Sequence, residues 1–277
     1  MGEKISVTDY EYRSDRVPLP FDGFKIAAVS DLHCKEIGKD NEVLIDRIKS
    51  LKPDIILCAG DMVTDHSKHM YVAIRLFERL SKEFDIYYSC GNHELKLGIN
   101  PRTDLIYRRY RRYLRSIGIN YLNNKSAYIV RGGKKLRIAG LNIRRIYYNK
   151  MCINKAVMPK GYVKSLVGEA EEDEFNILLA HNPEYFNMYA DWGADIVISG
   201  HIHGGMVVLP YIGGVISPSF RLFPHYDFGE FYEDGATMYL SRGLGSHTIP
   251  LRIFNPPEIM CITLRRNNNG SIQPCKQ

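Results

Sequence analysis

The sequence predicts an α/β fold, because short apolar runs alternate along the chain with segments of helical character. The apolar runs are nearly continuous in hydrophobic residues, which is typical of strands buried on both faces. These predicted strands lie at Phe24–Ser30, Ile55–Ala59, Ile86–Ser89, Phe175–Ala180 and Ile196–Ser199. The predicted helices between them lie at Glu42–Lys49, Lys68–Leu80, Asp104–Ile117 and Pro183–Ala190.

The rest of the chain predicts shorter strands and one long loop. Short runs around a glycine pair at positions 132–133 suggest small strands from about Asn120 to Ile143. Beyond Met206 the chain again favours strands and turns, and an apolar run follows at Glu258–Leu264. The segment Arg144–Lys164 shows no clear period, so we expect a long loop there.

The composition excludes several classes of protein. With 45% hydrophobic and 25% charged residues, the chain is unlike a wholly disordered, collagen-like or coiled-coil protein. Its 37 basic and 31 acidic side chains leave a net charge of +6, which suits an anionic substrate but is far from the charge density of a nucleic-acid tail. The six cysteines include no C-x-x-C pair, so neither a zinc ribbon nor a small disulfide scaffold is indicated.

The hydropathy of the chain bears on its location. No apolar run approaches the ~18 residues that a membrane-spanning helix needs. The N-terminal segment also lacks the apolar stretch of a signal peptide. As the chain stands we expect a cytoplasmic protein, and a membrane-associated or exported one if an N-terminal anchor has been removed.

Two distant segments follow the same pattern. Residues 54–61 and 195–201 each read as a buried strand that ends in glycine and is followed by a residue of a metal-binding type. In open α/β sheets, ligands gather beyond the carboxyl ends of the strands. Glycine at that point lets the backbone turn sharply and approach a bound group. The pattern therefore predicts a ligand site at these strand ends.

Five strand ends carry side chains that bind metals. They are Asp31 with His33, Asp61, Asn92 with His93, His181, and His201 with His203. On extended backbone, residues two apart point to the same side, so each D-x-H or H-x-H pair could serve one site. The set exceeds the four ligands of one structural zinc and suffices for two ions that share a carboxylate. Mixed imidazole, carboxylate and amide ligands suit Mn, Fe or Zn better than Mg²⁺ or Ca²⁺.

The ordered motifs D-L-H, G-D, G-N-H-E, a single His and G-H-I-H resemble the calcineurin-like metallophosphoesterase superfamily. The later stretches S-R-G-L-G at Ser241–Gly245 and N-P-P-E-I at Asn255–Ile259 are similar to its bacterial branch of small phosphoesterases. The resemblance covers Phe24 to Leu264 and implies a four-layer α-β-β-α sandwich with two mixed sheets. We therefore expect one metallophosphoesterase domain over residues 1–277, with its catalytic core at about 24–264.

The resemblance also implies two transition-metal ions per chain, Mn, Fe or Zn, and a role for each site residue. One ion would be held by Asp31, His33 and His203, and the other by Asn92, His181 and His201. Asp61 would bridge both ions. His93 would be catalytic rather than a ligand, donating to the phosphate or protonating the leaving oxygen.

These assignments imply a dinuclear metal-dependent phosphoesterase that hydrolyses phosphomonoesters or phosphodiesters by metal-activated water attack. The substrate would be a small or lipid-linked phosphoester, with room for peripheral membrane association and no obligate protein partner indicated. One alternative is a pyrophosphatase for a nucleotide- or lipid-linked diphosphate, such as a UDP-sugar lipid. Another is a non-catalytic binding module on the same fold, but such a module would be expected to lose ligands, and none is missing here.

Three further features allow two interpretations each. The aromatic and basic stretch Tyr107–Arg115 fits a helix with a packed tyrosine stripe and a solvated arginine face, which we favour over nucleic-acid or anionic-lipid contact. Arg242 would contact substrate phosphate or form a structural ion pair. Glu94 would orient His93 or serve as a capping or surface residue.

Overall fold

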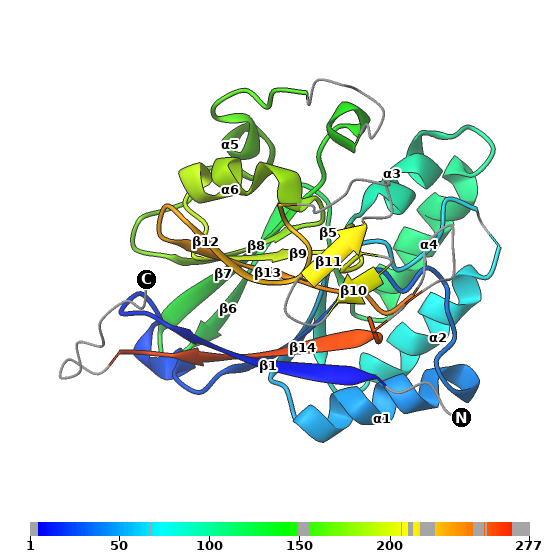
Figure 1. The fold of residues 1–277 in the computed structure, drawn as a ribbon, viewed down its shortest axis with the longest axis horizontal. Helices are drawn as coiled ribbons and strands as arrows, with labels where there is room; N and C mark the ends of the chain where they lie inside the picture. The colour runs from blue at the N-terminus through cyan, green and yellow to red at the C-terminus, as the bar shows by residue number, and fades with distance from the viewer. Residues whose placement is uncertain are drawn as a thin grey trace.

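Two mixed β-sheets lie face to face at the centre of the molecule (Figure 1). The computed structural model describes residues 5–66, 68–148, 156–205, 207–209, 213–216, 225–245, 252 and 254–267. In this part of the chain the first sheet has six strands in the order β1-β14-β2-β3-β4-β5, and the second has six in the order β12-β13-β9-β8-β7-β6. A two-stranded ribbon, β10 and β11, stands apart from both sheets.

The strand directions place several carboxyl ends side by side. In the first sheet β2, β3, β4 and β5 are parallel, and in the second β7, β8, β9 and β13 are parallel. The first sheet consists of β1 Ser6–Arg13, β14 Glu258–Arg265, β2 Lys25–Val29, β3 Ile55–Cys58, β4 Asp85–Ser89 and β5 Asn120–Leu122. The second consists of β12 Gly229–Glu233, β13 Ala236–Leu240, β9 Ile196–Ser199, β8 Phe175–Ala180, β7 Lys134–Leu141 and β6 Lys125–Arg131. The ribbon strands are β10 Val207–Leu209 and β11 Gly213–Ile216.

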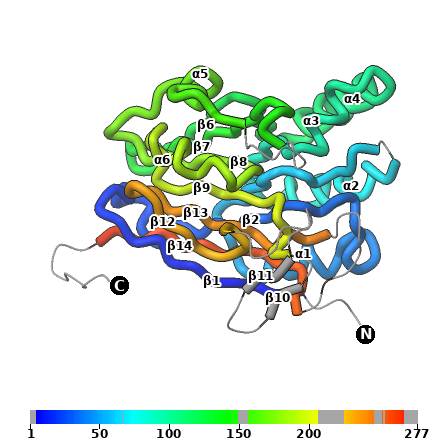
Figure 2. The backbone as a smooth tube through the Cα atoms, turned by 45° about the horizontal axis from the view of Figure 1, so that its top comes forward, coloured from blue at the N-terminus to red at the C-terminus, as the bar shows by residue number. Residues whose placement is uncertain are grey.

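Helices cover the outer face of each sheet (Figures 1 and 2). The first sheet carries α1 Glu42–Leu51, α2 Met70–Leu80, α3 Asn92–Ile99 and α4 Asp104–Ser116. The second carries α5 Tyr162–Val167 and α6 Phe186–Trp192. Short 3-10 turns lie at η1 Leu19–Phe21, η2 Lys39–Asn41, η3 Arg145–Tyr148 and η4 Pro183–Tyr185. None of the helices in these ranges combines the length and apolar character that crossing a bilayer requires.

Three hydrophobic clusters hold the layers together. Because successive side chains of a strand point to opposite faces, Ile26 of β2 packs between the sheets while Ala27 packs under the helices. The cluster between the sheets joins Leu57 of β3 to Ile177 of β8. A second cluster packs α1, α2 and α4 on the first sheet, and a third packs α5 and α6 on the second. This arrangement confirms the four-layer α-β-β-α sandwich, and it explains why the strand sequences are apolar at nearly every position.

Helix α4 carries the tyrosine stripe predicted for the arginine-rich stretch, while the absence of nucleic-acid or lipid contact stays a prediction. Its tyrosines Tyr107 and Tyr110, together with Leu114, are buried in the cluster on the first sheet. Arg109 and Arg112 are exposed on the opposite side. The packed stripe with a solvated basic face is thus confirmed for the buried residues, although Tyr113 at the stripe's edge is 39% exposed.

The structure differs from the sequence prediction in three places. The N-terminal strand β1 was not expected, because its pattern is half polar and its partner β14 lies about 250 residues away in the chain. Helix α3 was also missed, since its first buried residues are polar and give no apolar period. The long loop predicted at Arg144–Lys164 is wrong in part, because η3 and the start of α5 lie within it; residues 149–155 are outside the described part of the chain.

Candidate metal centre

The metal-binding residue types converge where parallel strands of both sheets end. Asp31 follows β2, Asp61 follows β3, and Asn92 opens α3 after β4. From the second sheet, His181 follows β8, and His201 and His203 follow β9. Loop hydrogen bonds bring these ends together beyond the strands: the Asp31 amide donates to Gly60 O at 3.0 Å, and the Gly200 amide to His181 O at 3.1 Å. The site is therefore built jointly by the two sheets.

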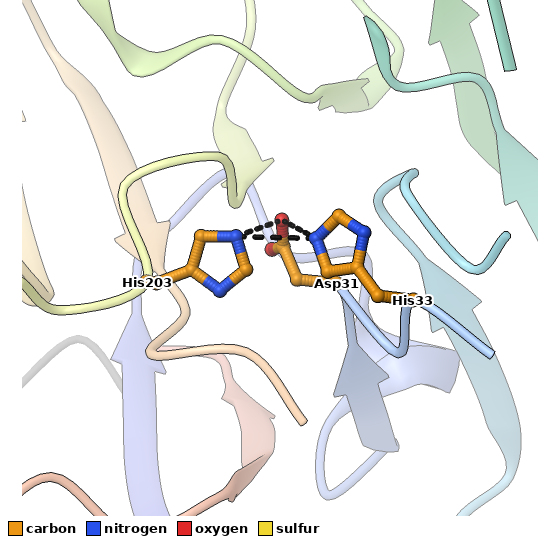
Figure 3. A group of neighbouring side chains, drawn as sticks. All are labelled: Asp31, His33 and His203. Atoms are coloured by element: carbon orange, nitrogen blue, oxygen red, sulfur yellow. Dashed lines mark hydrogen bonds and ion pairs between the residues drawn. The ribbon is translucent and has the colours of Figure 1, made fainter. Parts of the chain in front are cut away.

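The first group of ligand atoms comes from Asp31, His33 and His203 (Figure 3). The two imidazole Nε2 atoms lie 3.2 Å apart. Asp31 Oδ1 lies 3.7 Å from His33 Nε2 and 3.3 Å from His203 Nε2. All three side chains are buried. Three donor atoms that face one another at these distances form a set that could hold one ion.

The second group comes from Asp61, His181 and His201, whose ligand atoms lie within 4.8 Å of one another. His181 Nε2 lies 3.1 Å from Asp61 Oδ2. The other ring nitrogen, His181 Nδ1, lies 2.7 Å from Ala59 O, so it is the nitrogen that donates a hydrogen. A ring fixed in this way directs the Nε2 lone pair into the site, as backbone carbonyls bonded to the other ring nitrogen do for metal-binding histidines.

Asp61 lies between the two groups. Its Oδ2 atom is 3.1 Å from His181 Nε2 and 4.0 Å from His33 Nε2. It is also 3.9 Å from His93 Nε2, so Asp61, His33 and His93 form a third group that connects the other two. This position suits a carboxylate that is shared by two ions.

His93 has the opposite hydrogen-bond arrangement to His181. The Asp65 amide donates to His93 Nδ1 at 2.9 Å. A nitrogen that accepts a hydrogen bond carries no proton, so the neutral ring, as assigned from this network, carries its hydrogen on Nε2, which faces Asp61. His93 therefore presents an N–H donor to the site, where His181 presents a lone pair.

Glu94 fixes the loop that carries Asp61. One carboxylate oxygen accepts hydrogen bonds at 2.9 Å from the amides of Gly91 and Asp61. The other accepts from the Met62 amide at 2.9 Å and from Tyr88 Oη at 2.5 Å. Glu94 is fully buried and completes a capping box at the start of α3. The structure thus favours the capping interpretation of Glu94 and excludes a surface position.

The buried carboxylates of Asp31 and Asp61 make the site favourable for positive charge. Burial raises the pKa of Asp31 and Asp61, but the surrounding histidines outweigh it and hold both pKa values well below the ordinary range. His181 shows the reverse balance: burial lowers its pKa, and the two carboxylates raise it to about 9. Two buried carboxylates that remain ionised need compensating cations close by, which metal ions supply.

The backbone of the ligand loops is unusual. Asp31, His33, Asp61, His201 and His203 all have positive φ, between 50° and 75°. Such left-handed conformations are uncommon for residues other than glycine and cluster at functional sites. The expectation that the D-x-H and H-x-H pairs lie on extended backbone is therefore wrong. His201 and His203 in fact serve different groups of ligand atoms.

Two glycines let the loops approach the carboxylates. A Cβ atom at Gly91 would overlap Asp61 Oδ1, and one at Gly200 would overlap Asp31 Oδ2. Neither glycine has positive φ, so close approach, rather than backbone conformation, explains their presence.

The residues present fit a pair of metal ions. Asn92 Oδ1 is buried and has no hydrogen-bond partner among the described residues. His181 Nε2 likewise makes no hydrogen bond of acceptable geometry in that part of the chain. Buried polar atoms are nearly always paired, so the unpaired lone pairs of these two predicted ligands are available to bind a metal ion.

Arg242 follows β13, at the same end of the second sheet as His181 and His201. The Arg242 guanidinium stacks on Phe228 at 3.6 Å from the ring centroid, and its Nε lies 3.8 Å from Glu258. A contact between Arg242 and substrate stays a prediction.

Tyr148 was missed by the sequence analysis; its ring packs against those of His181 and His201. No motif surrounds it, and only its aromatic character within an aperiodic segment could have drawn attention to it.

Several known proteins are similar to this chain. The chain is 29% identical over 270 residues to the metallophosphoesterase YkuE of Bacillus subtilis (strain 168), covering 95% of this chain and 87% of that protein. It is 26% identical over 275 residues to a metallophosphoesterase of Aquifex aeolicus (strain VF5), covering 96% and 94%. Among solved structures, phosphopantetheinyl hydrolase from Mycobacterium tuberculosis is similar with a TM-score of 0.48 and 12% identity, covering 79% of this chain and 89% of that one.

A family model described as calcineurin-like phosphoesterase matches residues 24–205, which include all the candidate metal ligands described above. The match spans more than half of the chain. The chain therefore belongs to the calcineurin-like phosphoesterase family and is a metal-dependent phosphoester hydrolase.

Proposed function

We propose that the chain works as one catalytic domain in which seven side chains hold two transition-metal ions. Asp31, His33 and His203 hold one ion, Asn92, His181 and His201 hold the other, and Asp61 lies between them. The position of Asp61 Oδ2, near His181 on one side and His33 on the other, is the observation that carries this assignment. We propose Mn, Fe or Zn as the metals, because mixed imidazole and carboxylate ligands suit them.

The reaction follows from what such a site supplies. Two ions held by these residues would supply a water activated for attack on phosphorus and positive charge against the phosphate oxygens. His93 donates a hydrogen bond from Nε2 to a phosphate oxygen; its Nδ1 is occupied by the Asp65 amide, so the ring stays neutral and acts as a fixed donor. Glu94 holds the loop of Asp61 against the start of α3 and thereby sets the distance between ligand and donor.

Reconstitution tests this proposal. Metal-stripped protein loaded with Mn²⁺ is expected to bind about two ions per chain and to hydrolyse p-nitrophenyl phosphate or bis-p-nitrophenyl phosphate. Elemental analysis and absorbance of released p-nitrophenolate are the measurements. Fewer than about one ion per chain together with no turnover of either ester would refute a dinuclear hydrolase.

A pocket next to His93 favours a diphosphate as the substrate class. The pocket, of about 440 Å³, is lined by Lys96, Arg145, His66 and Asp65, among others. Asp65 pairs with Lys96 at 3.2 Å, whereas Arg145 has no ion-pair partner among the described residues. The same Asp65 contacts His93 through its amide, so the pocket adjoins the reacting phosphate. An unpaired guanidinium at this place suits the second phosphate of a nucleotide- or lipid-linked diphosphate.

Two adjacent arginines offer a matched test of the substrate class. Arg145→Ala is expected to lower kcat/KM for a nucleoside diphosphate sugar about ten-fold, since one charged hydrogen-bonding contact to phosphate is lost. Activity on bis-p-nitrophenyl phosphate, which has no second phosphate, should change little. Arg144→Ala is the control, because Arg144 is also exposed but does not line the pocket. An equal loss on both substrates, or the same loss in the control, would contradict a diphosphate site.

A further inference from the structure

Tyr148 packs against two histidines of the candidate site, although it belongs to none of the sequence motifs. It ends η3, and its ring centroid lies 5.4 Å from that of His201 with an interplanar angle of 69°. The distance to the His181 ring is 6.3 Å. Tyr148 is therefore positioned over the second group of ligand atoms, where it contacts two of the three histidines that come from the second sheet.

The hydroxyl of Tyr148 is buried and has no hydrogen-bond partner in the part of the chain that the structure describes. Tyrosines packed nearby behave differently. The Tyr189 hydroxyl donates to Asn182 O at 2.8 Å, and the Tyr185 hydroxyl donates to Ala156 O at 2.9 Å. A buried hydroxyl normally finds a partner, so one that has none among the described residues is available to a bound ligand.

Two atoms of the predicted metal ligands are also buried without a partner among the described residues. Asn92 Oδ1 at the start of α3 and His181 Nε2 after β8 are lone-pair donors, which suit a cation. The Tyr148 hydroxyl differs because it also carries a hydrogen, which suits an anion. In a centre where cations hold a phosphate, the lone pairs would bind the cations and the Tyr148 hydroxyl would donate to the phosphate.

We propose that Tyr148 is a substrate-binding residue whose hydroxyl donates a hydrogen bond to an oxygen of the metal-held phosphoryl group. This inference rests on the proposed dinuclear function. It adds a second donor to His93, and the two residues come from different elements, η3 and α3. Two donors on different elements orient the phosphoryl group between them, and a hydroxyl that has no protein partner to give up donates without reorganisation.

The adjacent tyrosines offer a matched pair of variants. Tyr148→Phe removes only the hydroxyl and keeps the ring that packs on the histidines. Tyr147→Phe is the control, because the Tyr147 ring packs on Tyr162 and Tyr185 at 5.1 and 5.4 Å, away from the ligand groups. Both variants and the parent are loaded with Mn²⁺, their metal content is measured by elemental analysis, and binding of inorganic phosphate is measured by calorimetry.

Tyr148→Phe is expected to keep the metal content of the parent and to weaken phosphate binding about ten-fold, with KM for phosphoesters raised in parallel. Tyr147→Phe should leave both quantities unchanged. Unchanged phosphate affinity in Tyr148→Phe would show that the residue only packs, and a loss of metal would show that it is a ligand; either result overturns the inference. If the parent binds metal and phosphate and Tyr148→Phe behaves identically, only this inference is refuted. If the parent binds neither metal nor phosphate, the proposed function is refuted as well.

Discussion

Replacing Asp61 with alanine is expected to remove bound metal and activity together. The Asp61 carboxylate lies between the two groups of ligand atoms, and without it two cations would face each other with no anion between them. The loss of turnover should reach three orders of magnitude or more, since each ion contributes several kcal/mol to charge stabilisation, roughly a factor of ten per 1.4 kcal/mol. Metal content per chain and kcat on p-nitrophenyl phosphate are measured side by side.

The control for this variant lies four residues away in the same loop. Asp65→Ala removes a carboxylate of the same charge that belongs to none of the groups of ligand atoms. It should keep the metal content of the parent, although its activity can fall through the contact with His93. If Asp61→Ala binds as much metal as Asp65→Ala, then Asp61 does not bridge the ions.

Replacing His93 with alanine is expected to separate metal binding from catalysis. The variant should keep most of its metal, because the ring presents an N–H group and not a lone pair. Turnover should fall about 10²–10³-fold, the usual cost of losing one fixed donor to a developing charge. Because a donor to a phosphate oxygen acts on every ester alike, the loss should be similar for p-nitrophenyl phosphate and for an alkyl phosphate.

The comparison of leaving groups makes this prediction specific. A loss confined to the alkyl ester would show that His93 protonates the leaving oxygen, since alkoxides need a proton and p-nitrophenolate does not. Metal loss as complete as in Asp61→Ala would make His93 a ligand. His69→Ala serves as the control, because His69 is exposed and belongs neither to the pocket next to His93 nor to the groups of ligand atoms.

Much of this site can be predicted from strand ends. Asp31, Asp61 and His181 each follow a continuous apolar run, and such runs identify buried parallel strands whose carboxyl ends meet. The strands β8 and β9 lie where the sequence predicts them. The pairing of ligands with ions was available only through the resemblance, because spacing along the chain does not tell which loops face each other.

The features that escaped prediction share a physical cause. The pairing of strand β1 and the packing of Tyr148 on His181 and His201 depend on groups distant in sequence, which local periodicity does not report. Helix α3 buries Asn92, His93 and Glu94, so its inward face is polar and hides the helix from a hydrophobic pattern. The tautomer of His93 depends on one backbone amide, a detail that only coordinates reveal.

The left-handed backbone of the ligand loops has a consequence for how this protein can change. At His33 and His203 a glycine would adopt the same φ with less strain, so a substitution that abolishes the chemistry would also relieve the fold. Selection for thermal stability alone would therefore favour glycine at these positions, and the enzyme would lose activity. Selection for turnover opposes these substitutions. Variants that become more stable and stay active should carry their stabilising substitutions in the helices and sheet edges, with the five residues of positive φ unchanged.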